Sequence, residues 1–187
     1  MQKLDIRTEF KEKRKSLSLE DKSNLSKRIA QVVADNFQLE NKVVSIFLSI
    51  ERLNEVDTSF LIRILKKANA KIYTPVSDFN TLELKHLSYD DNTIIKNNEW
   101  GIPEPTNGEG MDLKGFDIVF IPLLAVDAKG YRVGYGKGFY DRFLSQCRSD
   151  TIFIGLNYFE DLVEIDDLND GDMPIHFLVT PNGVLEF

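Results

Sequence analysis

Hydrophobic and polar positions follow two kinds of pattern along this chain. Apolar residues spaced three and four apart are typical of helices, and continuous β-branched runs are typical of strands buried on both faces. Helices are predicted over the segments 3–14, 18–33, 57–68 and 139–147. Buried strands are predicted over 43–50, 71–76, 116–126, 151–158 and 177–181, and the alternating segment 82–87 is expected at a sheet edge.

Local signals mark where several of these elements begin and end. Ser18 and Asp21 form a capping box, and Asp57 is suited to cap the third helix. Pro75 is expected to end its short strand. One glycine and two prolines predict an irregular loop over 97–105.

The alternation of strands and helices predicts an α/β fold. Because the strands are apolar on both faces, residues 1–187 are expected to form a single-domain three-layer sandwich around a mostly parallel, mixed, Rossmann-like sheet. Ligands of such folds bind at the carboxyl ends of the strands. The strand at 116–122 ends just before a glycine cluster, so the site is expected there.

Composition and charge narrow the class of protein. A formal net charge of −7 argues against a general nucleic-acid binder. The charged N-terminus does not resemble a secretory signal, and no apolar run approaches the ~20 residues of a membrane helix. With a single cysteine, the chain fits a reducing compartment, and we expect a cytoplasmic monomer.

The glycine cluster reads RVGYGKGFYDRFL over residues 132–144, with glycines at 134, 136 and 138. Glycine admits positive φ and close approach of a ligand, and successive free N–H groups form an anion nest. Arg132 and Lys137 add full positive charges, so the segment predicts a phosphate site. The alternative is a glycine-rich turn that joins a hairpin to a helix.

The spacing of the cluster excludes two familiar phosphate motifs. It matches neither the Walker A pattern nor the dinucleotide fingerprint, which would need glycine in place of Phe139. Asp141 is suited to hold Mg²⁺ beside a phosphate, or to serve as an acid in the first turn of a helix. Both interpretations of Asp141 remain open at this point.

The same residues carry a resemblance to a known family. The run IPLLAVDAKGYRVGYGKGFYDRFL (121–144) resembles the signature of the 5-formyltetrahydrofolate cyclo-ligases. Weaker similarities follow in the expected order, namely KLDIR (3–7), NEVDT (54–58), WGIPEP (100–105) and DMPIHFLVTP (172–181). Phe139 departs from the family, which commonly has tyrosine there, so a hydroxyl is absent at that position.

The resemblance implies a ligase that consumes ATP with Mg²⁺ and converts 5-formyltetrahydrofolate to 5,10-methenyltetrahydrofolate. It implies phosphate contacts from the N-terminal helix and from the glycine cluster, at Lys3, Arg7, Arg132, Val133, Gly134, Tyr135, Gly136, Lys137, Gly138, Phe139 and Tyr140. Folate contacts are implied at Ile50 and Glu55 and again at Tyr135, Gly136, Lys137, Gly138 and Phe139. Magnesium is assigned to Asp141 and Asp172, and the catalytic residues to Arg132, Lys137 and Tyr140.

Charge alone gives a different interpretation of the N-terminal helix. Lys3, Arg7 and Arg14 share a face with Phe10, and such basic faces are usually solvated. The resemblance overrides this for Lys3 and Arg7 but leaves Arg14 as a solvated residue. Two other functions stay open, a phosphotransferase or sugar-phosphate isomerase on a similar scaffold and a nucleotide-binding module without turnover.

Overall fold

The computed structural model of the chain describes residues 1–187, and its main feature is a seven-stranded sheet in the order β11-β10-β9-β6-β1-β2-β3. The five central strands are parallel, and the two edge strands are antiparallel. The strands are β1 (Val43–Ser45), β2 (Lys71–Asp78), β3 (Glu83–Ser88), β6 (Ile118–Pro122), β9 (Ile152–Leu156), β10 (Phe177–Thr180) and β11 (Gly183–Glu186). This mixed, mostly parallel sheet confirms the predicted α/β class.

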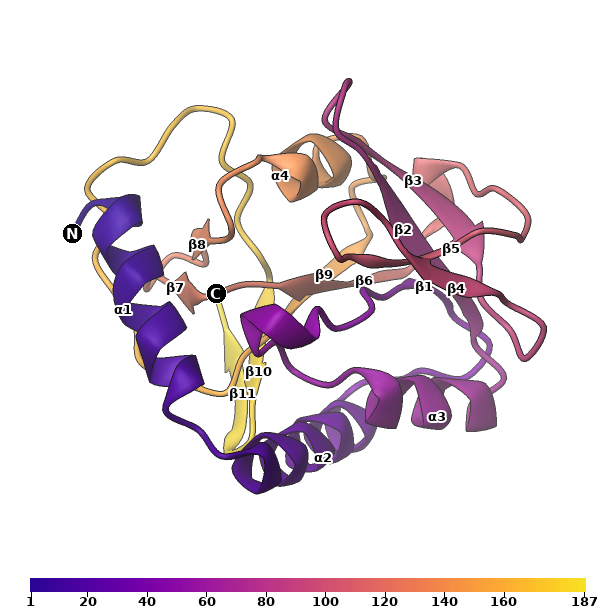
Figure 1. Ribbon diagram of the computed structural model, residues 1–187, viewed down its shortest axis with the longest axis horizontal. Helices are drawn as coiled ribbons and strands as arrows, with labels where there is room; N and C mark the ends of the chain where they lie inside the picture. The colour runs from indigo at the N-terminus through magenta and orange to yellow at the C-terminus, as the bar shows by residue number, and fades with distance from the viewer.

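Helices cover both faces of the sheet and give it three layers (Figure 1). Helices α2 (Leu19–Asn36) and α3 (Ser59–Lys67) lie along one face, and the short α4 (Phe139–Leu144) lies on the other. A hydrophobic core lies on each face of the sheet, and alternate residues of β6 contribute to the two cores. Ile118 and Phe120 pack under α2 and α3, whereas Val119 and Ile121 face α4. This continuous burial explains why the strand reads as an unbroken apolar run.

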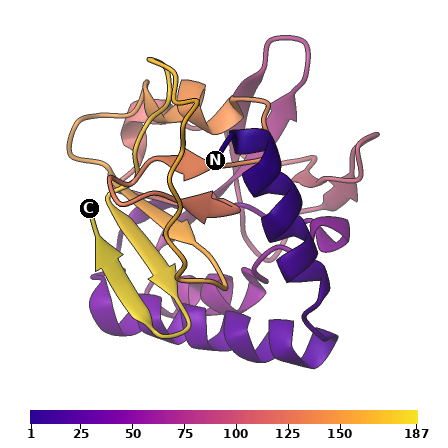
Figure 2. The same cartoon turned by 90° about the vertical axis from the view of Figure 1, so that its left-hand side faces the viewer.

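The N-terminal helix α1 (Lys3–Lys15) stands outside these layers. Ile6 and Phe10 pack against a hairpin of β7 (Ala125–Val126) and β8 (Arg132–Val133) and form a third, small core with Val133. Figure 2 shows α1 in front of the sheet, away from the C-terminal strands. The helix therefore reaches the glycine cluster that follows β8.

Several predicted boundaries are wrong, and local packing explains most of them. The predicted strand 43–50 stops at Ser45 because the chain then leaves the sheet, and the run 116–126 divides after Pro122 into β6 and β7. Pro75 lies inside β2 and does not end it. Past Tyr73, β2 pairs only with β3, so we infer that the missing N–H of Pro75 faces the side without a partner strand.

The expected loop 97–105 contains a second small hairpin, of β4 (Ile95–Asn97) and β5 (Pro103–Pro105). Its prolines oppose Asn97 and Ile95, at positions where an antiparallel pair exchanges no hydrogen bonds. β11 was not predicted, and α4 ends at Leu144, before the predicted limit at 147.

The capping box predicted for the second helix agrees with the structure, whereas the cap position of α3 is Thr58, one residue after the predicted Asp57. Ser18 and Asp21 form the capping box of α2, and the carboxylate of Asp57 accepts a hydrogen bond from the N–H of Ser59, at the start of α3, at 2.9 Å. None of the helices has both the length and the apolar character that crossing a bilayer requires.

Candidate active site

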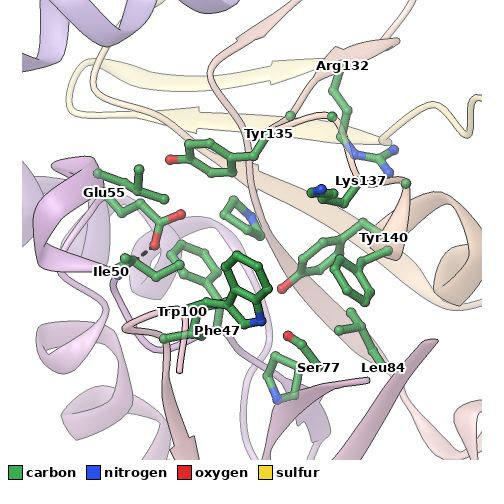
Figure 3. A pocket seen from close by; sticks show the side chains of 18 of the residues that line it. Phe47, Ile50, Glu55, Ser77, Leu84, Trp100, Arg132, Tyr135, Lys137 and Tyr140 are labelled. Atoms are coloured by element: carbon green, nitrogen blue, oxygen red, sulfur yellow. Dashed lines mark hydrogen bonds between the residues drawn. The ribbon is translucent and has the colours of Figure 1, made fainter. Parts of the chain in front are cut away.

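A cavity of about 360 Å³ lies at the carboxyl ends of the central strands, where the sequence predicts a site. Phe47 and Ile50 follow β1, Pro122 ends β6, and Ser77 belongs to the end of β2 that extends past β1. The glycine cluster and α1 close the opposite side (Figure 3). Segments far apart in sequence therefore meet around one space.

The glycine cluster forms a bare loop between β8 and α4. Gly136 and Gly138 have φ values of 92° and 70°, a region that other residues rarely adopt. Arg7 of α1 lies across this loop, and its Nε donates to the carbonyl oxygen of Gly134 at 2.9 Å. A Cβ at Gly136 would lie 3.2 Å from the Cζ of Arg7, so glycine also allows the close approach of α1.

Two cations of the cavity are paired with the two carboxylates predicted to hold magnesium. Arg132 donates to the Oδ1 of Asp141 at 2.8 Å, and Lys3 forms an ion pair with Asp172. Burial lowers the pKa of Arg132, although the neighbouring Asp141 opposes this shift. Lys137 is exposed on the loop and takes part in none of the salt bridges, so its ammonium group is free to receive an anion.

The donor set fits a magnesium ion that is shared with phosphate, but not an ion enclosed by protein ligands alone. No group of three or more His, Cys, Asp or Glu side chains is placed to bind a metal. Asp141 and Asp172 both line the cavity, and the N–H of Met173, next to Asp172, donates to Asp141 at 3.1 Å. Mg²⁺ is commonly held by one or two carboxylates together with substrate phosphates.

Glu55 is a buried carboxyl group on the wall of the cavity. It follows the 3₁₀ turn Glu51–Leu53, and its Oε2 accepts a hydrogen bond from the N–H of Ile50 at 2.7 Å. Burial raises the pKa of Glu55 to about 6, against the lowering effects of that hydrogen bond, of Arg14 and of Tyr135. A partly desolvated carboxylate near neutrality is suited to bind N–H groups of a substrate.

The hydroxyl groups of Tyr135 and Tyr140 enter the cavity from the side opposite Ile50 (Figure 3). Burial raises the pKa of both, so both phenols are neutral at pH 7. The Tyr140 hydroxyl is buried without any hydrogen-bond partner. Such a group is costly unless a ligand satisfies it.

One end of the cavity is aromatic. Phe79 contacts Trp100 and Phe139, with ring centroids 5.0 and 5.2 Å apart. Arg52 donates to the carbonyl oxygen of Trp100 at 2.7 Å and so ties the 3₁₀ turn to the tip of the β4–β5 hairpin. The cavity thus has an apolar end and a charged end, as an amphipathic ligand would require.

Nearly every residue predicted for the site lines this cavity. Those that do are Lys3, Arg7, Ile50, Glu55, Arg132, Gly134, Tyr135, Gly136, Lys137, Gly138, Phe139, Tyr140, Asp141 and Asp172. Val133 does not, because its side chain is fully buried against α1. Their contacts with ligands stay predictions.

The sequence interpretation of Arg14 is wrong. We expected a solvated residue, but only 1 % of Arg14 is exposed. Trp100 was assigned no part, yet it lines the apolar end of the cavity. The available signals for it were a tryptophan in a glycine- and proline-containing loop and the resemblance of the segment 100–105 to the family.

Comparison with known proteins identifies the family. A model of the 5-formyltetrahydrofolate cyclo-ligase family matches residues 1–181. The chain belongs to this family. A 5-formyltetrahydrofolate cyclo-ligase of Haemophilus influenzae is 34 % identical over 158 residues, which cover 82 % of this chain and 83 % of the relative. One of Mus musculus is 32 % identical over 153 residues, covering 78 % and 74 % of the two chains.

A solved structure agrees with this membership. The 5,10-methenyltetrahydrofolate synthetase of Aquifex aeolicus superposes with a TM-score of 0.82 at 27 % identity, covering 100 % of this chain and 93 % of the other. The expected family, its enzyme class and the α/β fold are therefore confirmed. The family also supports a small-molecule folate substrate.

Proposed function

We propose that the chain uses ATP and Mg²⁺ to convert 5-formyltetrahydrofolate to 5,10-methenyltetrahydrofolate, with release of ADP and phosphate. One observation carries the proposal: the aromatic end with Glu55 and the cationic glycine loop belong to the same cavity. A pterin is flat and carries N–H groups, whereas a triphosphate is anionic. The two ends of the cavity match these two ligands.

The chemistry begins at the formyl oxygen of the substrate, which is a poor leaving group. The γ-phosphorus of ATP forms a bond to this oxygen while its bond to the ADP oxygen breaks. N10 then attacks the formyl carbon and loses its proton, and the C–O bond breaks to release phosphate. Because the ring closure is intramolecular, positioning supplies much of its acceleration.

The chain's own residues serve the phosphoryl transfer. Lys137 and the loop N–H groups receive the phosphates, and Lys3, Arg7 and Arg132 flank them. Asp141 and Asp172 would hold the magnesium ion, which supplies charge neutralisation at the β- and γ-phosphates. On binding, Lys3 and Arg132 would turn from the carboxylates of Asp172 and Asp141 toward the phosphates, which would leave both carboxylates available to hold the metal.

The proposal predicts the products of a simple assay. The protein is mixed with ATP, Mg²⁺ and 5-formyltetrahydrofolate, and the methenyl product and ADP are measured together. Equal amounts of the two products are expected, with none when ATP is withheld. Binding of ATP without product would instead favour the nucleotide-binding module, and product without ADP would contradict the use of ATP.

Lys137→Ala tests the cationic loop. Removal of one charge that stabilises a transition state costs about 100-fold or more in kcat. An exposed loop lysine contributes little to the fold, so the free energy of unfolding should change by less than about 0.5 kcal/mol. Lys129→Ala, at an exposed lysine on the β7–β8 turn outside the cavity, is the matched control. Wild-type turnover by the Lys137 variant would contradict this assignment.

A further inference from the structure

Arg14 is a buried cation that no carboxylate contacts directly. One of its terminal nitrogens donates to the Tyr135 hydroxyl at 2.9 Å, and the other donates to Asn157 Oδ1 at 3.1 Å and to the carbonyl oxygen of Leu123. Its Nε has no partner. A buried charge is costly without an opposite charge nearby, so the nearest anion becomes important.

Glu55 is an anion whose charge interacts with that of Arg14, and its carboxyl group lies near the Tyr135 hydroxyl in the cavity (Figure 3). The hydroxyl accepts a hydrogen bond from Arg14, which leaves its own proton free to point to the carboxyl group. Both Arg14 and Tyr135 act on Glu55 in the direction that favours the carboxylate. Arg14, Tyr135 and Glu55 therefore form one chain of interactions, which begins on α1 behind the cavity wall and ends at a carboxyl group inside the cavity.

We propose that Arg14 is a positioning residue for the folate site, which holds the Tyr135 hydroxyl in place and through it fixes the Glu55 carboxyl toward the cavity. Arg14 itself does not line the cavity, so it acts only through Tyr135 and through its charge. The role of Glu55 in binding folate rests on the proposed function. The contact network that fixes Glu55 does not.

Other groups also face Glu55 and bear on its protonation. Arg52, in the 3₁₀ turn, favours the carboxylate, and the Ile50 N–H binds it directly. Tyr140 on α4 and Tyr158 after β9 are the remaining neighbours, and the Tyr158 hydroxyl donates to the Glu55 backbone oxygen at 2.7 Å. Arg14 also lies over the ring of Tyr158, with its Cζ 5.9 Å from the ring centroid, so Arg14→Gln disturbs this neighbour as well. Tyr135→Phe keeps that contact and therefore isolates the line of contacts through the Tyr135 hydroxyl.

The first experiment uses the ligand-free protein. The Glu55 carboxyl carbon, labelled with ¹³C and assigned with Glu55→Gln, is titrated by NMR in the wild type, Arg14→Gln, Tyr135→Phe and the double variant. The wild-type pKa is expected at about 6. Each single variant should raise it by about half a unit or more, and the double variant by less than the sum, because the two groups act in series.

The control is Lys13→Gln, which removes a charge from the same turn of α1 at a residue whose side chain is 38 % exposed. It should leave the titration unchanged. If Arg14→Gln does not fold, Tyr135→Phe decides, since it retains both α1 and the ring. A Glu55 that titrates as in the wild type in every folded variant would overturn the proposal and leave Arg14 a purely structural role.

The second experiment measures binding of 5-formyltetrahydrofolate without ATP at pH 7. Arg14→Gln, at a residue that does not line the cavity, should weaken folate binding about 5- to 30-fold, corresponding to ~1–2 kcal/mol, and leave ATP binding unchanged. Equal losses for both ligands would contradict a role at the folate end. If the wild type binds no folate, the proposed function fails, while the titration still decides whether Arg14 controls Glu55.

Discussion

Among the single groups of the cavity, the Tyr140 hydroxyl most clearly indicates a contact that a ligand would make. It is buried, has no hydrogen-bond partner and points into the cavity. Tyr140→Phe removes an unsatisfied polar group, so the free energy of unfolding should stay equal or rise. If the hydroxyl binds substrate or the transferred phosphoryl group, kcat/KM should fall about 10-fold or more.

Steady-state kinetics and urea unfolding test this pair of outcomes. Tyr131→Phe, on the β7–β8 turn outside the cavity, serves as the control. A Tyr140 variant that loses stability but keeps its activity would show that the hydroxyl serves the fold and not the reaction.

Glu55 makes a prediction about pH. Its pKa is 4.5 in the unfolded chain and about 6 in the folded one, so the folded protein binds this proton more tightly. The stability from this group is therefore fully present below pH 4.5 and is lost as the pH rises through 6. The loss amounts to about 2 kcal/mol for this shift.

Glu55→Gln removes this dependence while keeping an acceptor for the Ile50 N–H. Relative to the wild type, the variant should gain about 2 kcal/mol of unfolding free energy between pH 4.5 and pH 8. Denaturant unfolding at both pH values measures it, with Glu51→Gln as the exposed control. The same variant should bind folate weakly. A constant stability difference across this range would refute the prediction.

The sequence predicts the roles of some site residues but not the burial of others. The glycine spacing and the cations at 132 and 137 predicted the loop, because those properties are local. The burial of Arg14 is not local, since its partners Leu123, Tyr135 and Asn157 lie more than 100 residues away along the chain. Nothing in a basic helix indicates which of its cations will find such partners.

At the scale of elements, the β4–β5 hairpin positions the aromatic end of the cavity. Glu104 of β5 is buried and accepts the Ser77 N–H of β2 at 2.7 Å, where β1 no longer runs alongside. Glu104→Ala leaves that N–H without a partner, at a cost of about 1–3 kcal/mol. It should also loosen Trp100 at the hairpin tip and weaken folate binding more than ATP binding.

Glu104→Gln separates this contact from the charge, because its amide oxygen still accepts the hydrogen bond. Unfolding free energies and the two ligand affinities of both variants make the comparison. Equal effects of Ala and Gln would mean that the charge of Glu104, not its hydrogen bond, matters. The sequence missed this hairpin because its prolines indicate a loop unless the pairing register is known.

At the scale of the whole molecule, the cavity brings together four segments that lie far apart in the sequence. The proposed nucleotide end is built by α1 and the loop at 134–138, and the proposed folate end by residues 47–55 and the β4–β5 hairpin. The order of strands was beyond sequence pattern alone, because every central strand is apolar on both faces and none specifies its neighbours. The carboxyl-end location of the site followed from the α/β class itself.

This arrangement predicts how ligands protect the chain from amide hydrogen exchange. MgADP alone should slow exchange in 3–15 and 134–138, and 5-formyltetrahydrofolate alone should slow it in 47–55 and 95–105. The two together cannot react, because ADP lacks the phosphoryl group to transfer. They should protect both sets further, since each ligand closes one side of the same cavity, whereas β6 in the core should not change. Protection of 95–105 by MgADP alone would place the nucleotide at the aromatic end and reverse the two halves of the proposed site.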